Sequence, residues 1–282
     1  MSKCYINSYV YEYGKNLING NYYFNFLDRD NYPHVELRDK KSDLITSIKP
    51  YGKSAFLYIS NPSVVARRNE ALAHTKGTNG YVAGTFARDY GYDFDLIDIE
   101  ANMCSSGASA IEKAFSLVNN GFDSVVIFGA NFVDENNINL FKELRIDIKL
   151  TEAFACLLVG NAKSDVEILG ANVSTNIKDT STVSLSAKGY KKSYEWAKNI
   201  KIDGVKAHGT QTKTNNEQEQ QAIKESFGEC KVISYKQDIG HSLEANNLVE
   251  LGIFLDSHIK GTWLFSSSAF GNIYANFVIK RS

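Results

Sequence analysis

Residues 94–118, FDLIDIEANMCSSGASAIEKAFSLV, change from a strand pattern to a helix pattern at Cys104. Apolar and polar residues largely alternate from Phe94 to Glu100, which is typical of a strand. From Ser105 onward the apolar residues are spaced as on one face of a helix, at Ala108, Ile111, Phe115 and Val118. The sequence therefore predicts that Cys104 lies where a strand turns into a helix.

This position favours a reactive thiol. A side chain at a helix start lies near unpaired backbone N–H groups and the positive end of the helix dipole. Both stabilise a thiolate, so we expect the pKa of Cys104 to fall and its sulfur to be a candidate nucleophile. The alternative is that Cys104 packs as a small apolar residue, as isolated cysteines often do.

The composition excludes several classes of protein. The chain has 282 residues, of which 43% are hydrophobic, enough for one large domain or two modest ones. Lys and Arg total 31 against 32 for Asp and Glu, which predicts no binding to nucleic acid or to a membrane surface. No segment has the length and apolar character of a signal peptide or a membrane span, so we expect a cytoplasmic protein.

The cysteines are also informative through their spacing. They form no CxxC pair, which argues against a zinc framework and a dense disulfide scaffold and favours a reducing compartment. They are Cys4, Cys104, Cys156 and Cys230.

The rest of the chain reads as alternating strands and helices. Strands are expected at residues 3–11, 55–60, 94–100, 124–129, 153–160, 166–173, 202–207, 231–235, 262–266 and 273–279. Helices are expected at 105–120, 190–199, 215–227 and 242–259, with one or two more between Pro62 and Tyr90. The polar stretch from about Asp28 to Lys49 is expected to be a covering or functional loop.

Two regions of the chain share one order of elements. Strand, helix, strand, a loop or polar segment, and strand describe both Leu96 to Gly160 and Lys231 to Ile279. We therefore expect two similar halves, residues 1–162 and 163–282, in one compact unit related by a pseudo-two-fold axis. Under that symmetry Cys104 and His241 would occupy equivalent positions, each at the N-terminus of a core helix.

Three local sequences place reactive side chains at or beyond the C-terminal ends of strands. They are the turn at Cys104, KAHGTQT at residues 206–212, and KQDIGH at residues 236–241. Open α/β sheets bind ligands at this edge. One pocket containing Cys104, His208 and His241 is therefore expected.

These motifs, in this order, resemble those of the β-ketoacyl synthases of the thiolase superfamily. The matches are CSSG from Cys104, HGTxT from His208 to Thr212, and KxxxGH from Lys236 to His241. A weaker match is AFGN at residues 269–272, where the family has Gly-Phe-Gly-Gly. The resemblance extends from about Leu57 to the end, and it implies a thiolase-like five-layered α-β-α-β-α fold that is usually dimeric.

The resemblance also implies a reaction. Cys104 would accept an acyl group from a carrier-protein or CoA thioester and form a covalent acyl-enzyme. His208 and His241 would bind a malonyl thioester and stabilise the enolate left by its decarboxylation, which attacks the acyl group to give a 3-ketoacyl thioester. The backbone N–H groups of Cys104 and Phe270 would form the oxyanion hole.

Further residues match supporting positions of the family. Thr210 and Thr212 would hold the phosphopantetheine arm, and Lys236 and Glu219 would support the site as paired buried charges. Two neutral imidazoles can stabilise an oxyanion without a metal, so neither a metal nor a tightly bound cofactor is expected. The implied partners are an acyl carrier protein and a second subunit, in a homodimer or in a heterodimer with another ketosynthase-like chain.

The chain departs from the family in length and near the gate of the pocket. It is much shorter than an ordinary ketosynthase, both before Cys104 and between Cys104 and His208. Met103 could narrow the acyl channel, and three replacements restrict backbone freedom where the family opens and closes. They are Gln211 for a usual Gly, Asn216 where Asp is frequent, and Asn272 for a Gly.

Three hypotheses follow. The first is a compact condensing enzyme of a lipid, polyene or polyketide pathway. The second is an acyltransferase or thioesterase-like relative that uses Cys104 without condensing. The third is a non-catalytic partner subunit of the chain-length-factor type, which the shortened cover favours and the retention of Cys104, His208 and His241 opposes.

Overall fold

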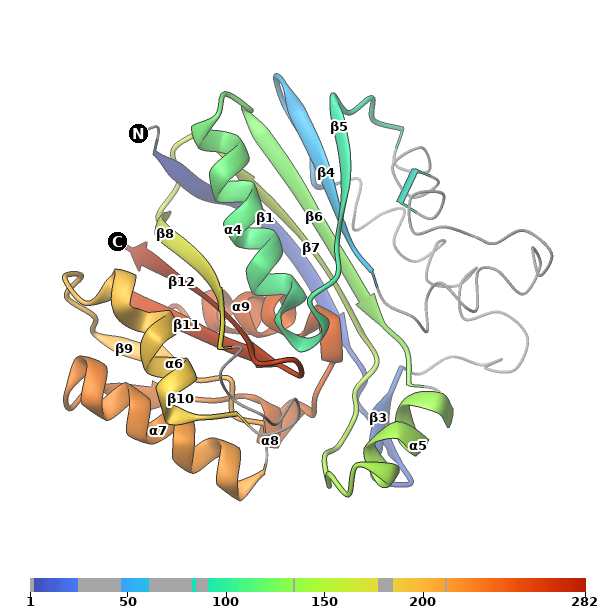
Figure 1. The fold of residues 1–282 in the computed structure, drawn as a ribbon. Coiled ribbons are helices and arrows are strands. Elements are labelled where there is room, and N and C mark those ends of the chain that lie inside the picture. Colours follow the sequence, from blue (N-terminus) through green and yellow to red (C-terminus); the bar gives the residue numbers. More distant parts are fainter. Residues whose placement is uncertain are drawn as a thin grey trace.

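A computed structural model describes residues 3–24, 47–60, 83–84, 91–133, 135–176, 185–210 and 212–282 (Figure 1). Most strands in these ranges form one mixed ten-stranded sheet. Its strands are β1 (Cys4–Tyr13), β4 (Ser54–Ile59), β5 (Leu96–Glu100), β6 (Ser124–Asn131), β7 (Ala153–Gly160), β8 (Val166–Thr175), β9 (Gly204–Lys206), β10 (Lys231–Ile233), β11 (Gly261–Ala269) and β12 (Ile273–Arg281). A separate hairpin consists of β2 (Asn16–Ile18) and β3 (Asn21–Tyr23).

The sheet is built from two halves with the same strand order. From its outer edge inward, the N-terminal half runs β5, β4, β6, β7, β1, and the C-terminal half runs β10, β9, β11, β12, β8. In each half the outer three strands are parallel to one another, and the fourth strand is antiparallel to both of its neighbours, the third and the fifth. The halves meet where Cys4 and Tyr5 pair with Ile168 and Glu167. The expectation of two similar halves is confirmed, while the exact boundary at residues 162 and 163 stays a prediction.

Two helices pack against strands of both halves. Helix α4 (Ser106–Asn119) contacts β4, β6 and β7 as well as β8 and β12. Helix α9 (Asn246–Asp256) contacts β1 and β7, and its Phe254 ring packs on Phe265 of β11. Most residues of both helices are buried, and α4 also has a partly exposed polar side at Glu112, Lys113 and Ser116.

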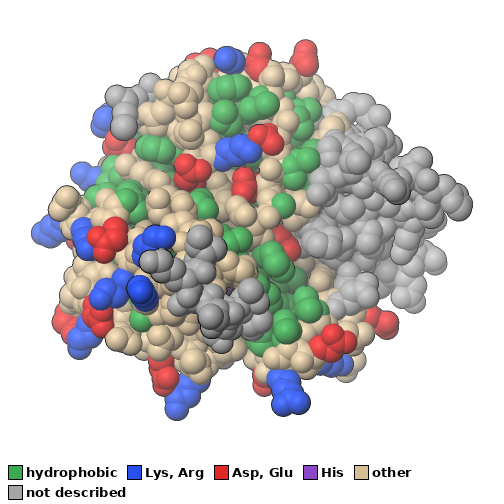
Figure 2. Space-filling view, viewed as in Figure 1, with side chains coloured by type: hydrophobic (Ala, Val, Ile, Leu, Met, Phe, Trp, Pro, Cys, Tyr) green, Lys and Arg blue, Asp and Glu red, His purple; other side chains and the backbone are tan. Residues whose placement is uncertain are grey.

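The outer face of the C-terminal half is covered by α6 (Ala187–Tyr194) and α7 (Lys213–Phe227). Lys and Glu side chains lie next to one another on the exposed sides of these helices (Figure 2). Lys191 of α6 forms a 2.5 Å ion pair with Glu225 of α7. Together with the two half-sheets and the α4–α9 layer, α6 and α7 account for four of the five layers of a thiolase-like fold.

On the outer face of the N-terminal half, Phe24, Ile48 and Ala83 pack on residues of β4, β6 and β7. The helices expected between Pro62 and Tyr90, and the loop expected from Asp28, lie outside the described residues except for residues 47–49 and 83–84. Within the described ranges, each helix is too short or too polar to span a bilayer.

Several element boundaries differ from the expectations. The helix expected at 190–199 is α6 followed by the 3-10 turn η3 (Glu195–Ala197), and the one expected at 242–259 is the 3-10 turn η4 (Leu243–Ala245) followed by α9. Helices α5 (Glu135–Glu143) and α8 (Lys236–Ile239) and the β2–β3 hairpin were not expected. They are short, and α5 is rich in Asn, so their apolar spacing is weak.

The proposed equivalence of Cys104 and His241 is wrong by three residues. The 3-10 turn η2 (Met103–Ser105) precedes α4 as η4 precedes α9, and both turns begin with a positive φ, 48° at Met103 and 44° at Leu243. By this register Cys104 corresponds to Glu244. His241 lies two residues before the turn, where it follows the end of α8.

Candidate active site

The structure brings Cys104, His208 and His241 together around one cavity. The centroids of the two imidazole rings are 5.6 Å apart, and the rings are nearly perpendicular. The other lining residues are Phe141, Ile146, Ile148, Leu185, Thr210, Thr212, Asn215, Ser268, Ala269 and Phe270. The three strand-end motifs therefore meet at one place, as their positions in the sequence predicted.

Cys104 is held by the C-terminal half of the protein. Its backbone carbonyl accepts hydrogen bonds from Asn246 Nδ2 at 2.7 Å and from Ser267 Oγ at 3.2 Å. Asn246 is the first residue of α9, and Ser267 belongs to β11. The conformation of the Cys104 turn thus depends on both halves.

The expectation of a lowered thiol pKa is wrong for this structure. Cys104 is only 8% exposed, and burial raises its pKa to about 12. The Glu244 carboxylate raises the pKa further, while the Lys236 ammonium opposes the shift. Helix α4 begins two residues after Cys104, and its dipole favours the thiolate. The loss of hydration on burial has the opposite effect on the pKa and is larger.

His241 is fixed by its neighbours on both sides. Gly240 has a φ of 77°, and a Cβ there would lie 2.1 Å from Thr151 Oγ1, so a residue without a side chain is needed. The His241 N–H donates to the Lys149 carbonyl at 2.7 Å, and its carbonyl accepts from the Thr151 N–H at 3.0 Å. These bonds attach the histidine to the segment that leads into β7.

The tautomer of His241 follows from a third bond. Its Nδ1 accepts a hydrogen bond from the Leu243 N–H at 3.0 Å. Burial, together with the charges of Lys236 and Lys206, lowers the pKa of His241 well below its usual value, so the ring is neutral. A neutral ring whose Nδ1 accepts must carry its proton on Nε2, which makes that atom a hydrogen-bond donor.

His208 is positioned through its backbone. The N–H groups of His208 and Gly209 donate to the two carboxylate oxygens of Glu219 at 2.7 and 2.9 Å, and Lys236 Nζ donates to the His208 carbonyl at 2.5 Å. Burial lowers the pKa of His208 well below its usual value, with further lowering by Lys236 and His241. His208 is therefore also neutral, and its buried Nδ1 has no hydrogen-bond partner among the described residues.

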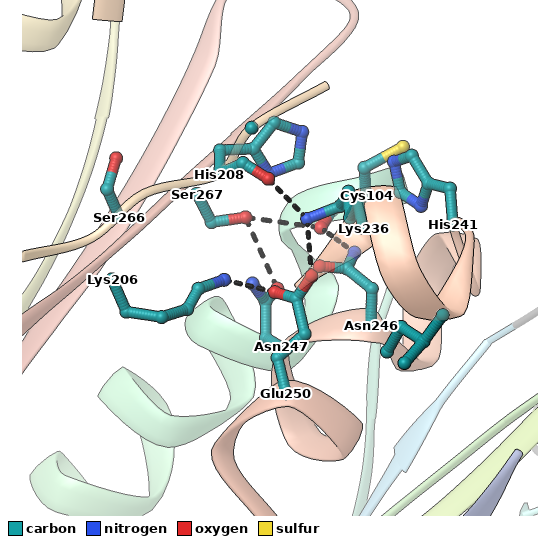
Figure 3. A network of polar contacts seen from close by, with 12 residues as sticks. Cys104, Lys206, His208, Lys236, His241, Asn246, Asn247, Glu250, Ser266 and Ser267 are labelled. Carbon is teal, nitrogen blue, oxygen red and sulfur yellow. Dashed lines mark hydrogen bonds and ion pairs between the residues drawn. The ribbon is translucent and has the colours of Figure 1, made fainter. Parts of the chain in front are cut away.

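A buried cluster of charges lies behind the histidines (Figure 3). Glu250 of α9 pairs with Lys236 at 2.8 Å through one oxygen and with Lys206 of β9 through the other. Burial lowers the pKa of Lys206 to about 8. Lys236 and Glu219 were predicted from the sequence, whereas Lys206, Glu250 and Asn246 were not. A charged residue inside a buried strand or helix was the available signal, because it requires a partner.

The remaining predicted residues surround the cavity. The hydroxyls of Thr210 and Thr212 are 2.9 Å apart at its partly exposed end. The ring of Phe270 packs on Phe141 with centroids 6.2 Å apart.

The structure describes three of the four residues that were expected to alter the gate. Asn272 has a φ of 56°, so it keeps a left-handed conformation that Asn tolerates. Met103 is 40% exposed and does not line the cavity, which contradicts the expectation that it narrows the channel. Asn216 lies in the first turn of α7 away from the cavity lining, and Gln211 lies outside the described residues.

Within the described ranges there is no group of three or more His, Cys, Asp or Glu side chains that could hold a metal ion. The expectation of chemistry without a metal stays a prediction.

Comparisons with known proteins agree with this picture. Residues 167–257 match the family model described as the C-terminal domain of β-ketoacyl synthases. A search of curated proteins found no match.

Three solved structures illustrate the likeness of the whole chain. A ketosynthase in complex with its chain length factor from Xenorhabdus doucetiae is 17% identical, with a TM-score of 0.75 over 100% of this chain and 98% of that one. A β-ketoacyl synthase from Burkholderia phymatum is 17% identical, with a TM-score of 0.73 over 100% of both chains. A complex of a type II polyketide synthase acyl-carrier protein with its ketosynthase is 14% identical, with a TM-score of 0.79 over 100% of both chains.

The protein therefore has a thiolase-like α/β fold. More narrowly, residues 167–257 are similar to the C-terminal domain of β-ketoacyl synthases, and the whole chain has the fold of the solved ketosynthases. The resemblance drawn from the sequence motifs is confirmed.

Proposed function

We propose that this chain is a β-ketoacyl synthase-like acyltransferase that forms a 3-ketoacyl thioester by decarboxylative condensation. One observation carries the proposal, namely that Cys104 and two neutral imidazoles line the buried end of a single cavity. The partly exposed end carries Thr210 and Thr212, whose hydroxyls suit the amide groups of a phosphopantetheine arm.

The first step would load the enzyme. Cys104 Sγ attacks the carbonyl carbon of an acyl thioester, and the bond from that carbon to the pantetheine sulfur breaks. The thiol proton of Cys104 passes to the leaving sulfur, so the step needs no outside acid or base. Because burial raises the pKa of the Cys104 thiol, the thiol would be protonated before the thioester binds.

The second step would form the carbon–carbon bond. The bond between carbon 2 of a malonyl thioester and its carboxylate carbon breaks and releases CO₂, and the electron pair forms an enolate. Nε2–H of His241 and the neutral ring of His208 would donate to the enolate oxygen. Carbon 2 then attacks the acyl carbonyl, the bond to Cys104 Sγ breaks, and the thiolate takes up one proton from solvent.

Partners follow from the same proposal. The substrates would arrive on an acyl carrier protein or on CoA in the cytoplasm. The structural relatives include a ketosynthase with its chain length factor and one with its acyl-carrier protein. Strand β5 lies at the edge of the sheet with Ile97 42% exposed, and exposed Met103 follows it closely, which supports a second subunit in a homodimer or a heterodimer there.

A second candidate is a partner subunit that does not catalyse. The buried, protonated thiol and the likeness to a complex that contains a chain length factor favour it. A relative that transfers acyl groups without condensing would share the loading step of the first candidate and, like the second, would form no carbon–carbon bond.

Intact-mass spectrometry tests the proposal. The protein is incubated with an acyl thioester of an acyl carrier protein, then with malonyl carrier protein, and both protein mass and product are measured. We expect one acyl adduct that Cys104→Ala abolishes and Cys230→Ala retains, followed by a 3-ketoacyl product. An adduct without product would favour simple acyl transfer, and no adduct would favour the partner subunit.

A further inference from the structure

Ser268 is a buried polar side chain that the reaction above does not use. It is 1% exposed and lines the cavity with Cys104, His208 and His241, which are also buried. The exposed end of the same cavity is formed by other residues, so Ser268 lies where the reacting part of a bound thioester must lie.

The hydrogen bond of Ser268 has a definite direction. Its Oγ is 2.6 Å from the hydroxyl of Tyr190, and either atom could be the donor by distance alone. Tyr190 is 1% exposed, and within the described part of the chain its hydroxyl has no other hydrogen-bond partner. A buried hydroxyl hydrogen without an acceptor is unfavourable, and Ser268 lines the cavity whereas Tyr190 does not. Tyr190 is therefore assigned as the donor and Ser268 as the acceptor, which leaves the free O–H at the residue where a bound ligand can accept it.

The neighbouring pair on the same strand shows the same arrangement with one difference. The hydroxyl of Tyr194 is 2.8 Å from Ser266 Oγ, and Ser266 in turn donates to Glu219 at 2.6 Å. The Ser266 hydroxyl thus donates its hydrogen bond to an acceptor within the protein. Ser268 has no such acceptor among the described residues, and its O–H is left to point into the cavity.

We propose that Ser268 is a specificity-determining residue that donates a hydrogen bond to an oxygen on carbon 3 of the bound thioester group. The assignment rests on the proposed function. The thioester carbonyl would be held at Cys104 and the histidines, so the atoms beyond carbon 2 are those that can reach the remaining buried donor. Malonyl and 3-keto groups carry such an oxygen, and a plain alkyl group does not.

Unreactive amide analogues of pantetheine thioesters provide the test. Butyryl, 3-ketobutyryl and malonyl pantetheine amides have similar size and differ mainly at carbon 3. Their dissociation constants would be measured by calorimetry on the full chain. The mass of the malonyl analogue would be checked afterwards to verify that it has kept its carboxylate. We expect at least one oxygenated analogue to bind about tenfold more tightly than the butyryl amide, as one hydrogen bond provides.

Three variants isolate the hydroxyl. Ser268→Ala should abolish the preference without weakening the butyryl analogue, and Ser268→Thr should retain it. Tyr190→Phe removes the partner but keeps the cavity donor, so it should preserve the preference. Whichever of the 3-ketobutyryl and malonyl amides binds more tightly shows whether Ser268 contacts a keto oxygen or a carboxylate.

Two results would overturn the assignment in distinguishable ways. If the amides bind and Ser268→Ala keeps the wild-type preference, the hydroxyl does not contact carbon 3, and the proposed function is untouched. If none of the three amides binds, the cavity does not accept pantetheine-linked groups, and the proposed function fails together with the role of Ser268.

Discussion

At the scale of single residues, burial and the helix N-terminus act in opposite directions on Cys104. The helix dipole contributes at most about 2 kcal/mol, whereas removing a thiolate from water costs more. The sequence showed the helix start but not the burial, because burial depends on α9 and β11, which follow more than 130 residues later. This is why the position of Cys104 was predictable and its pKa was not.

Alkylation by iodoacetamide tests the protonated thiol. Cys230 is only partly buried, so it should react first at pH 7.5, while the rate at Cys104 should rise about tenfold per pH unit between pH 8 and 10. Peptide mass spectrometry reports each site separately. Faster labelling of Cys104 than of Cys230 at pH 7.5 would show that the thiol is activated before substrate arrives.

At the scale of elements, the long strands and core helices were predictable because their apolar periods are clear. Strand β7 has the expected bounds, and α7 differs by two residues. The 3-10 turns before α4 and α9 were not predictable, because a positive φ at Met103 or Leu243 has no signal in the residue type. Those turns set the register of the site, which explains the error of three residues at His241.

The ion cluster between β9, α8 and α9 makes a contrasting prediction for two variants. Glu250→Gln removes the carboxylate that pairs with two buried ammonium groups and should lower the free energy of unfolding by about 3 to 5 kcal/mol. Lys206→Met leaves the pair of Glu250 with Lys236 intact and removes a charge whose burial is costly, so stability should change little or rise.

Urea unfolding at pH 7.5, followed by circular dichroism, measures both variants. Lys3→Met, which removes an exposed ion pair with Glu167, is the control, with an expected change below about 1 kcal/mol. An equal loss for Lys206→Met and Glu250→Gln would mean that the three charges stabilise the fold as a unit.

At the scale of the whole molecule, His208 and His241 link stability to pH. Their pKa values are lowered in the folded protein, so below about pH 6.5 the unfolded chain binds protons that the folded chain does not. Stability is therefore fully present above pH 6.5 and decreases as the pH falls. Between pH 6.5 and 5.5 the two histidines should together remove about 2 kcal/mol from the free energy of unfolding.

Unfolding in urea at several pH values checks this slope. His241→Gln should reduce the pH-dependent loss by about half, because one neutral buried imidazole remains. A slope unaffected by His241→Gln would mean that this ring is protonated in the folded state.

The division of the site between the halves has a consequence for how the protein acquires it. The thiol comes from the N-terminal half, both imidazoles come from the C-terminal half, and Asn246 and Ser267 reach across to the carbonyl of Cys104. A nascent chain that has folded only its first half has the thiol of Cys104 but lacks both imidazoles. The complete site would then form only when the two halves dock, and heating would dismantle it as soon as the halves begin to separate.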